Sequence, residues 1–279
     1  MDIALIAGLL IAVILIGVGM IISGANILSY ISFDSLLIVL GGTVGTTLAG
    51  VTLKQGLSIF KSLIKCVKPP KIDWEGTISQ FVELATIARR DGVIMLQDKI
   101  DSQENDLVRA GLQLIVDGAD SDILFLVVST RIGIKKEEDK VSGDIFSTMG
   151  AYAPGFGLLG TVLGLIMVLG NLSEPEKLGA GIAQAFLTTL YGIIFANLFF
   201  LPIANKMKLN TKEYSRYYEM LLAGLMSIQE GDNPLLLEEK LKAYCPDKFV
   251  EEPVPGSSGQ GAQEGEMEYG SGELQAETT

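Results

Sequence analysis

Long stretches of the chain contain only apolar and small uncharged residues. They cover residues 3–33, 35–53, 145–173 and 178–205, and none of the four contains Asp, Glu, Lys or Arg. Each is close to or above the roughly 20 apolar residues with which an α-helix crosses a hydrocarbon core of about 30 Å. The pattern predicts an all-α, polytopic membrane protein with four transmembrane helices.

Basic residues are distributed unevenly around these stretches. The connection between the first two has none, and the connection between the last two has only Lys177. The second stretch is followed by Lys54, Lys61, Lys65, Lys68 and Lys71, and the fourth by Lys206, Lys208, Lys212 and Arg216. Because cytoplasmic loops carry the excess of Lys and Arg, both termini and residues 54–144 are expected in the cytoplasm.

Residues 54–144 are predicted to form a helical cytoplasmic domain. The domain begins with an amphipathic stretch, typical of a helix that lies on an anionic membrane surface, and Pro69 and Pro70 end it. The stretch places Leu57, Phe60, Ile64 and Val67 on one face and Lys54, Lys61, Lys65 and Lys68 on the other. Helical periodicity continues from Asp73 to Gly92, over 93–100 and 106–116, and from Asp122 into the third apolar stretch. That stretch would form a helix about 43 Å long, so we expect it to project beyond the bilayer.

The net charge of −12 is concentrated at the C-terminal end. Residues 249–279 contain no Lys or Arg and carry Glu251, Glu252, Glu264, Glu266, Glu268, Glu273 and Glu277. This composition favours a solubilising disordered tail over a specific acidic interaction tail, and nothing indicates nucleic-acid binding. The predicted organisation is transmembrane helices in 1–53, the cytoplasmic domain in 54–144, transmembrane helices in 145–207, cytoplasmic helices in 208–248 and the tail in 249–279.

Enzymatic chemistry has little support in the sequence. The chain contains no histidine, which excludes histidine ligands, histidine proton relays and histidine-dependent triads. Cys66 and Cys245 lie far apart in segments expected in the reducing cytoplasm, so no disulfide is predicted. Without a phosphate loop, a metal cluster or a nucleophile with a base, we expect neither an enzyme nor a bound cofactor.

Small and polar residues interrupt the last two apolar stretches. The third contains Pro154, Thr161 and glycines at 157, 160 and 164, a spacing that also serves ordinary close packing of transmembrane helices. The fourth contains Thr188, Thr189 and Tyr191, and Pro202 follows further on. Its threonines can bond to carbonyls of their own helix or line a narrow polar path. Neither stretch has an ionisable group, so ion movement along them requires an Asp or Glu from a partner.

These two stretches resemble the third and fourth transmembrane signatures of the MotA/PomA family, the A subunits of flagellar motor stators. The order of elements agrees over residues 1–245. The resemblance implies a homopentamer around two copies of a MotB/PomB-type B subunit (5:2) in the bacterial cytoplasmic (inner) membrane. The transmembrane Asp of that B subunit carries H⁺ or Na⁺, and the sequence leaves the choice of ion open.

The same resemblance assigns roles to individual residues. It implies that Thr161 and Thr189 face the ion-carrying Asp of the B subunit. Thr188 and Tyr191 would line the channel beside them. The resemblance also implies that Pro154 and Pro202 hinge or gate the channel mouth, in line with the missing backbone N–H of proline inside a helix.

A second signature surrounds Arg89 and Arg90. It resembles the family segment that contacts the rotor protein FliG, in which a basic pair is followed by acidic residues. Arg89 and Arg90 match the basic pair and Asp98 matches one acid, whereas Gln97 stands where the family often has Glu. The resemblance thus implies a rotor contact with a weakened acidic half.

Two other classes of membrane protein stay open. An energiser of outer-membrane processes of the TolQ/ExbB kind also forms a ring around a carboxylate-bearing partner, but such proteins typically have three spans. A self-contained solute carrier would need a polar or charged midplane site or broken repeats, and the sequence shows neither.

Overall fold

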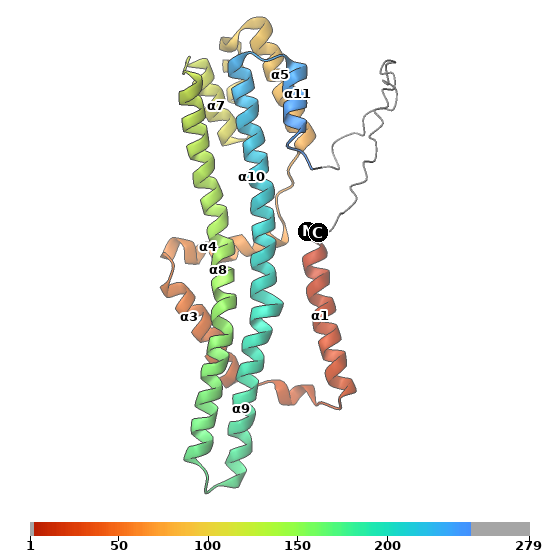
Figure 1. Ribbon diagram of the computed structural model, residues 1–279, viewed down its shortest axis with the longest axis vertical. Helices are drawn as coiled ribbons and strands as arrows, with labels where there is room; N and C mark the ends of the chain where they lie inside the picture. Colours follow the sequence, from red (N-terminus) through yellow and green to blue (C-terminus); the bar gives the residue numbers. More distant parts are fainter. Residues whose placement is uncertain (1–2, 247–279) are drawn as a thin grey trace, which may run out of the picture.

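The chain folds into a long molecule in which helices run side by side along its length (Figure 1). The computed structural model describes residues 3–246, without the side chains of residues 3, 58, 60, 61, 65, 176 and 177. No strand occurs within the described residues, which confirms the all-α prediction. The predicted acidic tail, 249–279, lies outside them.

The apolar stretches form the lower half of the molecule as Figure 1 is drawn. In chain order the helices are α1 (Ile3–Ile22), η1 (Ile27–Tyr30), α2 (Phe33–Leu36), the π-helical η2 (Leu37–Gly41), α3 (Gly42–Ala49), α8 (Ser121–Gly170), α9 (Pro175–Ile194), the π-helical η4 (Phe195–Phe200) and α10 (Leu201–Glu230). Among residues 3–246, three helices are long and apolar enough to cross a membrane, and Phe33–Ala49 is a shorter apolar helix. The first charge-free stretch extends to residue 33, but α1 ends at Ile22. The chain turns there because Gly24 adopts φ +74°.

α8 and α10 connect the two halves of the molecule without a break. α8 has 50 residues and is therefore about 75 Å long, well beyond a bilayer core, as the sequence predicts. The predicted boundaries at residues 144 and 207 fall inside α8 and α10, so no linker separates the halves.

α4 (Leu53–Val67) lies across the long helices rather than along them (Figure 1). A capping box between Thr52 and Gln55 begins the helix, because each side chain bonds the other's backbone N–H. Near its middle, the hydroxyls of Ser62 and Ser142 are 2.7 Å apart, which fixes α4 to α8. The following connector is held to α10 by the Tyr214 hydroxyl, which donates to the carbonyl of Pro70 at 2.9 Å.

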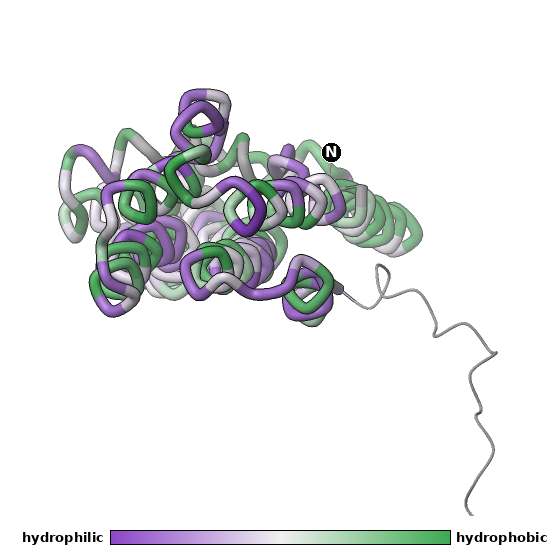
Figure 2. Tube along the Cα trace, turned by 90° about the horizontal axis from the view of Figure 1, so that it is seen from above, coloured by the Kyte–Doolittle hydropathy of each residue, from purple (hydrophilic) through white to green (hydrophobic). Residues whose placement is uncertain are grey.

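The upper half is a helical bundle built around the far ends of α8 and α10. Its other members are α5 (Trp74–Asp91), η3 (Val93–Leu96), α6 (Gln97–Ile100), α7 (Asp106–Val116) and α11 (Pro234–Lys242). Its core includes the fully buried side chains of Phe81, Leu112, Leu124, Leu225 and Leu237. Figure 2 shows hydrophilic residues along the outside of this bundle, whereas α1 is hydrophobic on every side.

Gly224 on α10 lets α5 approach closely. A Cβ atom at this position would lie 2.5 Å from ring carbons of Phe81, which is fully buried. Gly133 on α8 offers a contrast, since a Cβ atom there would meet nothing within 4 Å.

The variant Gly224→Ala should therefore lower the free energy of unfolding by about 1–3 kcal/mol, because the buried ring has to shift. Gly133→Ala should be neutral or stabilise by about 0.5–1 kcal/mol through the higher helix propensity of Ala. Thermal unfolding of the detergent-solubilised chain checks both, and equal melting temperatures for the two variants would contradict this packing.

Candidate functional site

Glycines bring the backbones of α8 and α9 close together. A Cβ atom on Gly192 would lie 2.7 Å from the carbonyl oxygen of Ala153 and 3.0 Å from the Cα of Gly157. A Cβ atom on Gly164 would lie 2.8 Å from the carbonyl oxygen of Gly181. Distances under 3.0 Å are shorter than a side chain tolerates, so the predicted close approach of these helices is confirmed.

Thr161 and Thr189 meet at this close approach. The Thr161 hydroxyl lies within 3.0 Å of the Ala185 carbonyl on α9 and makes a short hydrogen bond with the Thr189 hydroxyl. The carbonyl of Gly157 lies 3.2 Å from the Thr161 hydroxyl and 3.5 Å from that of Thr189. A hydroxyl has a single proton to donate but two lone pairs, so this cluster is rich in acceptor oxygens. Both threonines are half-buried and stay within reach of a partner or an ion.

Thr188 points in a different direction. Its side chain is 0% exposed and packs against Gly160, where a Cβ atom would lie 2.5 Å from the threonine methyl. Its hydroxyl donates within its own helix, toward the carbonyls of Ala185 at 2.9 Å and Gln184 at 3.1 Å. Thr188 therefore fills the helix contact, and its hydroxyl is satisfied there.

Tyr191 connects α9 to the segment between α1 and α2. Its hydroxyl donates to the carbonyl of Tyr30 at 2.5 Å and accepts the N–H of Ser32 at 2.9 Å. Both partners are main-chain atoms at the start of the second apolar helix. Of the residues predicted to line one path, the structure thus brings Thr161 and Thr189 together and gives Thr188 and Tyr191 other neighbours.

The two prolines lie in different backbone surroundings. α8 continues through Pro154 without interruption. Pro202 stands in the first turn of α10, directly after the π-helical η4 (Phe195–Phe200). A proline cannot donate to the helix ladder and its ring crowds the preceding turn, and in membrane helices local π-helical adjustments help to satisfy the backbone groups that this frees. The family resemblance implies a hinge or gating role for Pro202, but the sequence has no signal for the π-helical turn before it.

The end of α5 lies at the end of the molecule opposite the α8–α9 turn (Figure 1). Arg89 and Arg90 stand in the last turn of α5, and Asp98 stands in the following α6. Arg90 pairs with its neighbour Asp91, with Nη2 and Oδ2 2.8 Å apart. This hydrogen bond raises the pKa of Arg90 and lowers the pKa of Asp91. Arg89 and Asp98 are exposed and form no ion pair with the described residues.

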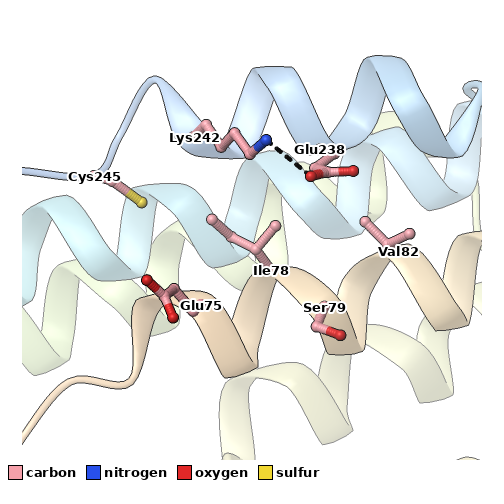
Figure 3. A pocket seen from close by; sticks show the side chains of 7 residues that line it. All are labelled: Glu75, Ile78, Ser79, Val82, Glu238, Lys242 and Cys245. Atoms are coloured by element: carbon pink, nitrogen blue, oxygen red, sulfur yellow. Dashed lines mark ion pairs between the residues drawn. The ribbon is translucent and has the colours of Figure 1, made fainter. Parts of the chain in front are cut away.

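A shallow hollow lies between α5 and α11, close to the end of the described chain. Figure 3 shows the residues that line it: Glu75, Ile78, Ser79, Val82, Glu238, Lys242 and Cys245. Lys242 pairs with Glu238 at 2.9 Å, and burial raises the pKa of the Cys245 thiol. A protonated thiol is a poor nucleophile, so we assign no chemistry to this hollow.

Comparisons with known proteins find relatives over most of the chain. The profile of the MotA/TolQ/ExbB proton channel family matches residues 99–220. Motility protein A of Cereibacter sphaeroides is 34% identical over 86% of this chain and 94% of its own length. The chain belongs to the motility protein A family. Motility protein A of Helicobacter pylori (strain J99 / ATCC 700824) is 35% identical over 88% of this chain and 95% of its own.

Two solved structures extend the likeness to nearly the whole fold. The structure of C. jejuni MotAB aligns with a TM-score of 0.83 at 30% identity and covers 90% of this chain and 99% of its own. The flagellar MotAB stator complex from Bacillus subtilis aligns with a TM-score of 0.77 at 28% identity, over 88% and 98%. The predicted MotA/PomA resemblance is thereby confirmed.

Gly192→Ala should destabilise this motility protein A relative by about 1–3 kcal/mol, since the added methyl group separates α8 from α9. Gly155→Ala is the matched control on α8, because a Cβ atom there meets nothing within 4 Å. Thermal melting in detergent measures both. If Gly192→Ala and the unmodified chain have the same melting temperature, the backbones of α8 and α9 are not in contact.

Proposed function

We propose that this chain is the A subunit of a flagellar motor stator. With a B subunit it conducts H⁺ or Na⁺ across the bacterial cytoplasmic membrane and converts the ion flux into torque on the rotor. The observation that carries the proposal is the match of nearly the whole fold to two MotAB complexes. A TolQ/ExbB-like energiser is less favoured, since the chain covers 94% of a curated motility protein A.

The proposed topology has four membrane spans: α1, Phe33–Ala49, the lower part of α8, and α9 with the start of α10. Phe33–Ala49 is about 25 Å long as a helix, close to the thickness of a hydrocarbon core. The orientation of α4 across the long helices supports a place at the inner membrane surface, in contact with lipid. Both termini and the upper bundle then lie in the cytoplasm.

The ion step takes place at the contact of α8 and α9 with the B subunit. The residues of Phe33–Ala49 and 145–205, apart from Asp34 and the loop acids Glu174 and Glu176, carry no carboxylate, so the ion-binding group comes from the Asp of the MotB/PomB-type partner. The hydroxyls of Thr161 and Thr189 offer oxygen atoms to that Asp or to its ion. Oxygen ligands suit Na⁺, and a hydroxyl can equally bond a protonated carboxyl group.

Torque requires a rigid path from this contact to the rotor. Five copies of the chain would surround two B subunits, and each ion step would move the ring around them. α8 runs unbroken from Thr161 to the upper bundle, and α9 continues through η4 into α10, which also reaches that bundle. Movement at the contact would therefore reach Arg89, Arg90 and Asp98 there. These side chains would contact the rotor protein FliG.

Motility of a strain that lacks both stator subunits tests the proposal. Expression of this chain together with its B subunit should restore swimming, whereas either chain alone should not. Comparison of sodium-containing and sodium-free media identifies the ion, since a Na⁺-driven stator stops without sodium. Membrane expression of both chains without swimming, in a host with a matching rotor, would favour the transport energiser.

The two kinds of threonine provide a matched pair of variants. Thr161→Val should reduce ion conduction at least tenfold, because it removes the hydroxyl shared with Thr189. Thr188→Val should retain most of the conduction, because that hydroxyl bonds only its own helix. Ion uptake by vesicles containing the A–B complex measures both variants. Equal losses would show that the helix contact, rather than the Thr161–Thr189 pair, is what conduction depends on.

A further inference from the structure

Two apolar side chains stand exposed at the rotor-facing end of the molecule. The segment from Arg89 to Asp98, here called the tip, comprises the end of α5, all of η3 and the start of α6. Within it the side chains of Ile94 and Met95 are 72% and 50% exposed. The next residue, Leu96, is 0% exposed and belongs to the core of the upper bundle. The tip therefore presents two apolar groups on a firmly packed base.

The backbone holds these two side chains in a defined position. Gly92 ends α5 with φ +90°, a conformation that other residues rarely adopt, and turns the chain into η3. The N–H of Met95 donates to the carbonyl of Gly92 at 3.2 Å and closes this turn. Behind it, Lys99 of α6 pairs with Glu83 of α5 at 2.9 Å. A preformed surface of this kind loses little conformational freedom when a partner binds.

Two of the four charged side chains of the tip, Arg90 and Asp91, pair with each other. Their contact is bidentate, with Nε of Arg90 donating to Oδ1 of Asp91 and Nη2 donating to Oδ2, and residue 97 is a neutral glutamine. Arg89 and Asp98 are the charged side chains of the tip that no described residue pairs. An exposed ion pair contributes little to binding, whereas burial of a large apolar side chain contributes considerably more.

We infer that Ile94 and Met95 form the apolar centre of the rotor contact, with Arg89 and Asp98 at its rim. The partner surface is then an apolar patch on the rotor protein, bordered by a carboxylate that faces Arg89 and a basic side chain that faces Asp98. An apolar centre inside a polar rim is the usual arrangement of protein interfaces. This inference rests on the proposed function and names the chemistry of its rotor contact.

The double variant Ile94→Ser, Met95→Ser tests it in the full chain expressed with the B subunit. The matched control is Leu235→Ser, Leu236→Ser at the start of α11, where the side chains are 71% and 51% exposed. We expect the tip variant to lower stall torque at least fivefold while ion conduction stays within twofold of the unmodified complex. The α11 variant should change neither quantity, and Arg89→Ala or Asp98→Ala alone should lower torque less than the tip variant does.

Binding of the purified rotor protein to the immobilised A–B complex provides a second measurement. Affinity should fall at least tenfold for the tip variant, and for the unmodified complex it should change little between low and physiological salt. Normal torque and affinity in the tip variant, or an equal loss in the α11 variant, overturn the inference alone. If the unmodified chain restores no swimming, the proposed function fails with it.

Discussion

The direct contact between the backbones of α8 and α9 is the constraint on which the membrane half depends. Because glycine occupies positions 157, 164 and 192, carbonyl groups of each helix come within reach of hydroxyls on the other. Larger residues there would push the helices apart and leave Thr161 with partners on its own helix only. The cluster of oxygen atoms around Thr161 and Thr189 therefore depends on the absence of side chains at these glycines as well as on the two threonines.

The long helices α8 and α10 connect this local contact to the upper half of the molecule. The cores of the two halves are separate, one around Ile145, Phe146 and Phe200 and the other around Phe81 and Leu225. α8 and α10 contribute to both cores, so neither half can turn without the other. The π-helical η4 in front of α10 is the place where this continuity departs from regular α-helix.

Much of this architecture could be predicted from the sequence, because it follows from local signals. The cap at Asp73, the end at Gly92 and the helix over 106–116 all occur as the periodicity predicts. Neighbouring threonines were harder to distinguish, since residues 188 and 189 differ by 100° around the helix and only the position of α8 decides which one faces Thr161. The π-helical turns have no sequence signature, and the contact from Tyr191 to Tyr30 joins residues 161 positions apart.

That contact also bears on which positions of the chain are free to diverge. Tyr191 holds the segment between the first two apolar helices through a carbonyl and an N–H, groups that nearly every amino acid supplies. Contacts of this kind depend on the backbone conformation of the segment and not on its side chains. Substitutions in this segment can therefore change the properties of that membrane face while the hydrogen bonds to Tyr191 on α9 are retained.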